Sequence, residues 1–153
     1  MNFKFEPISV DVARSVRDEK ISPQYGHPAF TEIATGYGPC RHCLRKFEEG
    51  TEERILFTYN AFEGLLDLPL PGPVFIHLRA CKRYSTDGFP PELIDRPLLL
   101  ESYTADGSIA STVAIDAAAP EDQIARLLAD DSTRFINIRN AEAGCHVANI
   151  FRK

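Results

Sequence analysis

Short apolar stretches recur along the chain, each bounded by glycine, proline, asparagine or aspartate, and this pattern is typical of β-strands. The predicted strands cover residues 3–8, 30–35, 54–59, 73–78, 98–103, 109–115, 135–138 and 146–151. An Asp-Gly pair at 106–107 favours a tight hairpin between two of them. A turn at 140–144 predicts a second hairpin, which would bring Arg139 and Asn140 near Cys145.

Two segments space their apolar residues as helices do. Residues 9–20 carry apolar side chains on one face, and Ser9 or Asp11 suits the capping position. Residues 120–130 begin with a proline and continue with acidic residues and an apolar stripe, which predicts a second helix. A single helical turn is expected near residues 92–95. Because the strands are grouped with few helices between them, we predict a single α+β domain with a mainly antiparallel sheet and two or three helices.

The composition is that of an ordinary globular protein. The 153 residues are 44% hydrophobic and 25% charged, which suits one packed core. The net charge of -5 argues against a nucleic-acid surface, and paired carboxylates such as Glu52-Glu53 are typical of solvated charge. With no signal-peptide stretch and no run of about 18 apolar residues, we expect a cytoplasmic protein with no membrane partner. A small molecule and a second copy of the chain remain candidate partners.

The chemical signal of the chain is the position of its four cysteines, each close to a histidine or an arginine. Cys40 and Cys43 form a Cys-x2-Cys pair after a Gly-Pro turn. Cys81 follows His77, and Cys145 directly precedes a histidine. In a reducing compartment we expect thiols unless a metal or a redox cycle uses them. Thiolates and imidazoles are both metal ligands and nucleophiles, so this clustering narrows the chemistry to a few classes.

Three parts of the chain form a specific combination: residues 37–44 (Tyr-Gly-Pro-Cys-Arg-His-Cys-Leu), residues 72–77 followed by Cys81, and Arg-Asn at 139–140 with Gly-Cys at 144–145. In this combination the chain resembles a bacterial family, domain of unknown function 1203. Its members are similar single domains of about this length, so the resemblance implies one domain and a bacterial origin. It implies no reaction, cofactor or partner.

A metal site is one interpretation, with zinc as the candidate cofactor. Two thiolates spaced as Cys-x2-Cys reach one Zn²⁺ from a turn, with Zn–S distances of about 2.3 Å. Cys40 and Cys43 are then the first two ligands. Cys81 and Cys145 complete a set of four, and His77 is a further available donor. Such a site would make the chain a structural or interaction module.

Thiol redox chemistry is a second interpretation. Cys-x2-Cys is the spacing at which a nucleophile and a resolving cysteine meet, which makes Cys40 and Cys43 catalytic candidates together with His77. Arg41 and Arg45 beside the pair would stabilise a thiolate. A thioredoxin-like motif, however, opens a helix between parallel strands, and the neighbouring strands here are predicted to be antiparallel.

A pocket for a small anionic ligand is the third interpretation, and it is the function that the sequence favours, as a site of binding or catalysis. Arg41, Arg139 and Asn140 would form a fork for a carboxylate or a phosphate. We expect the functional surface where residues 40–43, 77–81 and 139–145 converge, because cysteines and arginines are concentrated in these segments.

Overall fold

The computed structural model describes residues 2–36, 38–65 and 71–153, so Tyr37 of the family-like combination lies outside the description. The described residues form eight strands, two α-helices and one short 3₁₀ helix. In chain order these are β1 (Phe3–Glu6), α1 (Val10–Glu19), β2 (Phe30–Ile33), β3 (Glu53–Tyr59), β4 (Gly72–His77), η1 (Pro91–Leu93), β5 (Leu98–Tyr103), β6 (Ile109–Ala114), α2 (Pro120–Ala129), β7 (Phe135–Asn140) and β8 (His146–Arg152). None of the helices among these residues combines the length and the apolar character needed to cross a bilayer.

The larger sheet has five strands in the order β1-β8-β7-β5-β6, and every neighbouring pair is antiparallel. β1 pairs with β8 near the other end of the chain, with Phe3 opposite Arg152. Helix α2 packs against one face of this sheet through Ile124 and Leu128, which are buried with apolar residues of β5, β7 and β8. Burying this apolar stripe against the sheet is what stabilises a helix of this length.

The smaller sheet has the antiparallel order β2-β3-β4 and a core of its own. Helix α1 packs against it with Ala13 and Val16, both fully buried. Ser9 caps the helix by accepting a hydrogen bond from its first turn. Cys40 and Cys43 belong to this core, so the Cys-x2-Cys pair is held against the smaller sheet.

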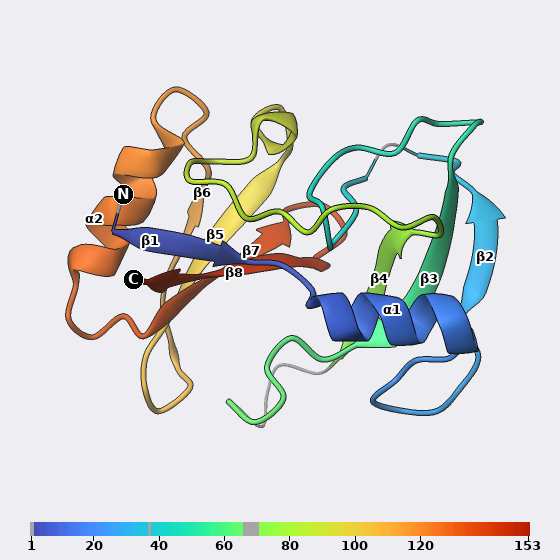
Figure 1. The fold of residues 1–153 in the computed structure, drawn as a ribbon. Coiled ribbons are helices and arrows are strands. Elements are labelled where there is room, and N and C mark those ends of the chain that lie inside the picture. Colours follow the sequence, from blue (N-terminus) through green and yellow to red (C-terminus); the bar gives the residue numbers. More distant parts are fainter. Residues whose placement is uncertain (1, 37, 66–70) are drawn as a thin grey trace.

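Figure 1 shows the two sheets side by side, with α2 against the larger and α1 against the smaller. The predicted α+β fold with antiparallel strands is confirmed, although the strands divide into two sheets because each helix covers a separate apolar face. Both predicted hairpins form. The β5-β6 turn contains Gly107 with a φ of +89°, and in the β7-β8 turn the N–H of Asn140 donates to the carbonyl of Cys145 at 2.9 Å.

Candidate metal centre

The Cys-x2-Cys pair lies in a tight turn. The N–H of Cys40 donates to the carbonyl of Arg45 at 2.9 Å, and the N–H of Leu44 donates to the carbonyl of Cys40 at 2.8 Å. Leu44 adopts a φ of +59°, in the left-handed region that turns the chain back on itself. Its side chain is buried in the core, and this packing offsets the cost of the unusual conformation.

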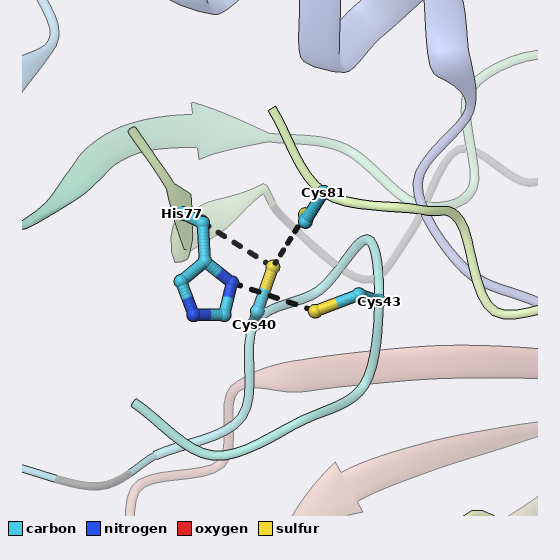
Figure 2. Close-up of side chains that lie close together, drawn as sticks. All are labelled: Cys40, Cys43, His77 and Cys81. Carbon is cyan, nitrogen blue, oxygen red and sulfur yellow. Dashed lines mark hydrogen bonds between the residues drawn. The ribbon is translucent and has the colours of Figure 1, made fainter. Parts of the chain in front are cut away.

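His77, the last residue of β4, and Cys81, four residues later, lie beside the two cysteines of this turn and complete a group of four (Figure 2). The ligand atoms of Cys40, Cys43, His77 and Cys81 all lie within 4.8 Å of one another. The Sγ atoms of Cys40 and Cys81 are 3.9 Å apart. The Sγ atom of Cys43 is 3.4 Å from Nδ1 of His77. Cys81 is half-buried and the other three are buried, so the group is largely closed to water.

The Cys40–Cys81 and Cys43–His77 distances are close to the edge lengths of a tetrahedral metal site. With Zn–S and Zn–N distances of about 2.3 and 2.0 Å, two sulfur ligands lie about 3.8 Å apart and a sulfur and a nitrogen about 3.5 Å apart. A disulfide requires sulfur atoms about 2.05 Å apart. All four cysteines of the chain are free thiols. The spacing of the donors therefore suits a shared ion better than a covalent pair.

The imidazole of His77 is oriented by a carboxylate on its far side. Its Nε2 lies 3.1 Å from Oε2 of Glu52, just before β3. The same carboxylate oxygen accepts a hydrogen bond from the backbone N–H of Glu48 at 2.7 Å, which holds it in place. A carboxylate bonded to the outer nitrogen of a histidine leaves the inner nitrogen to face a metal, and this pairing is usual for histidine ligands.

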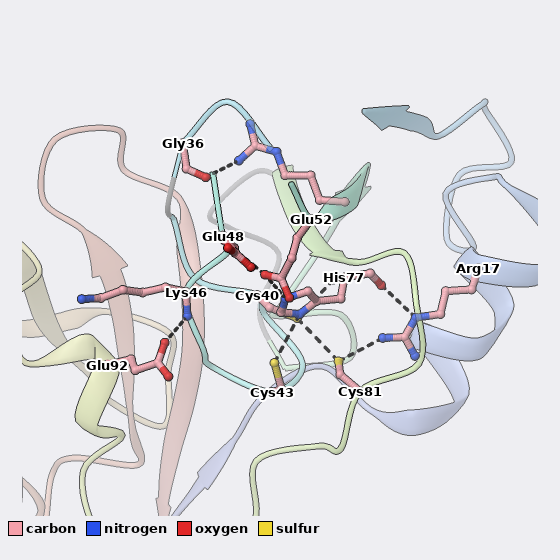
Figure 3. A network of polar contacts seen from close by, with 11 residues as sticks. Arg17, Gly36, Cys40, Cys43, Lys46, Glu48, Glu52, His77, Cys81 and Glu92 are labelled. Atoms are coloured by element: carbon pink, nitrogen blue, oxygen red, sulfur yellow. Dashed lines mark hydrogen bonds and ion pairs between the residues drawn. The ribbon is translucent and has the colours of Figure 1, made fainter. Parts of the chain in front are cut away.

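Helix α1 reaches the group through Arg17, as Figure 3 shows. One guanidinium nitrogen of Arg17 lies 3.2 Å from Sγ of Cys81, and Nε donates to the carbonyl of His77 at 2.9 Å. The backbone N–H of His77 donates to Sγ of Cys40 at 3.3 Å. Hydrogen bonds of this kind to the sulfur of a metal ligand orient the ligand, so Arg17 and the backbone of His77 are placed to support a metal site.

Charge is already separated among the four donors. Hydrogen bonds from Cys40 and Cys81 lower the pKa of Cys43 far below the usual value of a thiol. Burial, followed by hydrogen bonds with its thiol neighbours, raises the pKa of Cys40. Burial alone would lower the pKa of His77, but hydrogen bonds to two thiols and to Glu52 raise it to about 10. Near neutral pH, the metal-free group therefore holds a thiolate beside an imidazolium, and a metal ion would displace protons on binding.

Cys145 is not part of this group. It lies just before β8 and lines a separate small cavity together with Arg139 and His146. Three of the four cysteines predicted as metal ligands therefore lie together, and His77 stands where Cys145 was expected. Of the three segments predicted to converge, residues 40–43 and 77–81 form the group. The β7-β8 hairpin meets the Cys-x2-Cys turn through Arg41, whose Nε lies 2.7 Å from the carbonyl of His146, while Cys145 lines a cavity between this hairpin and strands β3 and β4.

The three residues predicted to bind an anion together, Arg41, Arg139 and Asn140, make different contacts in the structure. The guanidinium of the buried Arg41 donates to the carbonyls of His146 at 2.7 Å and Pro39 at 2.6 Å. Oδ1 of Asn140 accepts two backbone N–H groups of the hairpin turn. Arg139, by contrast, lines the cavity. Arg41 and Asn140 thus use these polar groups to hold backbone in place.

Sequence reasoning missed Glu52 and Arg17. Glu52 stands in an acidic stretch that has the pattern of solvated charge, and Arg17 lies sixty residues from its partner His77. The sequence around Glu52 and around Arg17 therefore gives no indication that either residue contacts His77. Their roles arise because β4 pairs with β3 and α1 packs across the smaller sheet, which are contacts between distant parts of the chain.

The fold and the site define an antiparallel α+β protein with a buried group of three cysteines and one histidine. The chain belongs to the family described as protein of unknown function (DUF1203), whose sequence model matches residues 37–152. The match spans the whole cysteine and histidine group, and it confirms the family resemblance seen in the sequence. No curated protein and no solved structure matches the chain.

Proposed function

We propose that this chain is a zinc-binding domain in which Cys40, Cys43, His77 and Cys81 hold one Zn²⁺. The observation that supports the proposal is the approach of their four ligand atoms to within 4.8 Å of one another from separate parts of the chain. Thiolate and imidazole donors at tetrahedral spacing favour zinc over hard cations such as Mg²⁺ and Ca²⁺, which prefer oxygen.

The role that fits this donor set is structural. Catalytic zinc sites keep one position for water or substrate, whereas four protein ligands close the coordination sphere. The ion would join the Cys-x2-Cys turn to the end of β4 and to the segment that carries Cys81. Through Arg17 it would also secure helix α1, which contacts two members of the group. A reducing compartment keeps the cysteines available as zinc ligands, and we therefore infer that the domain acts in the cytoplasm.

Metal analysis of protein purified without added metal tests this proposal. We expect about one equivalent of zinc per chain, and slow reaction of three of the four thiols until a chelator is added. The Cys145→Ser variant is the matched control and should keep its zinc, because Cys145 lies outside the group. Less than about 0.1 equivalent of any transition metal, with four freely reacting thiols, would overturn the proposal.

Thiol redox chemistry is a second candidate, favoured by the low pKa of Cys43 beside His77. The strands around the pair are antiparallel, so the βαβ setting of a thioredoxin-like motif is missing from the described residues. In a redox protein, metal-free Cys43 would alkylate rapidly near neutral pH and form a reversible disulfide with Cys40. In a zinc protein, the same alkylation would begin only after the metal is removed.

A further inference from the structure

A second polar site lies where the two sheets meet, apart from the cysteine and histidine group. A cavity of about 100 Å³ is bounded by β3 and β4 on one side and by β7 and β8 on the other. Its size suits a few heavy atoms and excludes a nucleotide, because pockets for larger ligands measure about 300 Å³ or more. Rings and polar side chains form much of its lining: Tyr59, Phe62, Asn137, Arg139, Cys145 and His146.

A buried polar row supports this cavity from the larger sheet. Glu101, Asn137 and Asn149 lie opposite one another on β5, β7 and β8, and their exposed fractions are 3%, 1% and 6%. Apolar residues at these three positions would make the fold more stable, because buried polar groups cost free energy unless every one is hydrogen-bonded. Such a row beside a cavity is the arrangement expected of a binding site.

The row fixes the proton of His146. Nδ2 of Asn137 donates to Glu101 at 3.3 Å, so Oδ1 of the same amide faces His146 and accepts from its Nδ1 at 2.7 Å. Nδ1 therefore carries the hydrogen, and Nε2 keeps a free lone pair. Among the residues that the structure describes, Nε2 of His146 has no hydrogen-bond partner. Burial, together with the charge of Arg41, lowers the pKa of His146 to about 3, which agrees with a neutral ring.

Arg139 supplies the positive charge of the cavity. One of its terminal nitrogens lies 3.4 Å from the buried carboxylate of Glu101, and a third of the side chain is exposed. Its Nε is buried and has no hydrogen-bond partner within the described part of the chain. The terminal N–H groups on the exposed part of the guanidinium are the donors available to a ligand. Because Glu101 lies so close, a singly charged anion suits the cavity better than a doubly charged phosphate.

We propose that this cavity binds a small monocarboxylate, with the carboxylate held by Arg139 and a hydrogen-bond donor of the ligand facing Nε2 of His146. The aromatic rings of Tyr59 and Phe62 would pack against its apolar part. The site does not rest on the proposed zinc ion, since none of its residues belongs to the cysteine and histidine group.

Cys145 provides a reporter inside the cavity, because its half-buried thiol can be alkylated by probes that differ in charge. Iodoacetate carries a carboxylate and iodoacetamide does not. We expect the rate ratio of iodoacetate to iodoacetamide at Cys145, measured by peptide mass spectrometry, to exceed that of free cysteine about fivefold or more. Added acetate should slow iodoacetamide alkylation of Cys145 in a saturable manner. A ratio equal to that of free cysteine, with no protection by acetate, would overturn the proposal.

Arg139→Gln should return the ratio to that of free cysteine and abolish protection by acetate. Arg134→Gln is its matched control, since Arg134 is exposed just before β7 and makes the same change in net charge. Because Arg139→Gln strands the charge of Glu101, the double variant Arg139→Gln with Glu101→Gln is measured too. Retention of the ratio and of protection in both variants would refute the role of Arg139.

Zinc content is measured in the same samples. A chain that contains no metal but keeps the preference for iodoacetate would contradict the zinc proposal and leave the carboxylate proposal intact.

Discussion

His77 and Glu52 share a contact of 3.1 Å between Nε2 and a carboxylate oxygen, on the side of the imidazole that faces away from the cysteines. Partners of this kind typically change metal affinity 10- to 100-fold. We therefore expect Glu52→Gln to weaken zinc binding by about that factor while the fold is kept. Competition with a chromogenic chelator measures the affinity. Glu53→Gln, at an exposed neighbouring position, is the control, and equal affinities in the two variants would refute the role of Glu52.

If the group holds zinc as proposed, replacing Cys81 should abolish zinc binding and destabilise the protein. Cys81 is the half-buried member of the group, so Cys81→Ser disturbs packing little and isolates the effect of the lost ligand. We expect zinc content near zero and a loss of at least about 3 kcal/mol in the free energy of unfolding, because zinc-binding energy is folding energy in such sites. Urea denaturation gives the value. Cys145→Ser should stay within about 0.5 kcal/mol of the original protein, and similar losses in both variants would contradict the assignment.

Arg17 should link helix α1 to the proposed zinc site. Its two hydrogen bonds, to Sγ of Cys81 and to the carbonyl of His77, are charge-assisted and partly buried. Arg17→Gln is expected to cost about 1–3 kcal/mol of stability and to raise the rate of zinc loss to a chelator. Arg14→Gln, at an exposed position of the same helix, makes the same charge change. If both variants release zinc at the same rate, helix α1 is not coupled to the site through Arg17.

The burial of His146 should make stability depend on pH. Its folded pKa of about 3 lies below the value of 6.5 for a free histidine. Above pH 6.5 the ring is neutral in both the folded and the unfolded state, so it does not make the free energy of unfolding depend on pH. Between pH 6.5 and 3 the unfolded chain takes up a proton that the folded chain does not, so the free energy of unfolding falls by up to about 1.4 kcal/mol per pH unit.

His146→Gln should remove this part of the slope. The comparison is made by urea denaturation across pH 4 to 7, with His27→Gln as the control because His27 is exposed. Protonation of the cysteine and histidine group acts in all three proteins, so the difference between the curves isolates His146. Parallel curves for the original protein and His146→Gln would show that the ring is not held neutral in the folded state.

Local sequence patterns determined most of the elements of this protein. The alternation of apolar residues, the Asp-Gly pair at 106–107 and the proline at 120 each act within about ten residues, which is the range over which turn chemistry and periodicity operate. Both helices, both hairpins and the antiparallel α+β class followed from them. The Cys-x2-Cys pair, together with His77 and Cys81, likewise indicated which side chains form the cysteine and histidine group.

The tertiary structure decided which of these residues meet. His77 joins Cys81 and the turn because β4 pairs with β3 beside helix α1, and Cys145 is carried to a different cavity by the β7-β8 hairpin. Nothing in the spacing of four cysteines distinguishes these outcomes, because each contact depends on how two sheets bury their apolar faces. The same packing buries Arg41 and aligns Glu101 with Asn137 across neighbouring strands. Burial and strand pairing determine which residues come into contact across dozens of positions. The periodicity of apolar residues along the chain does not predict these contacts.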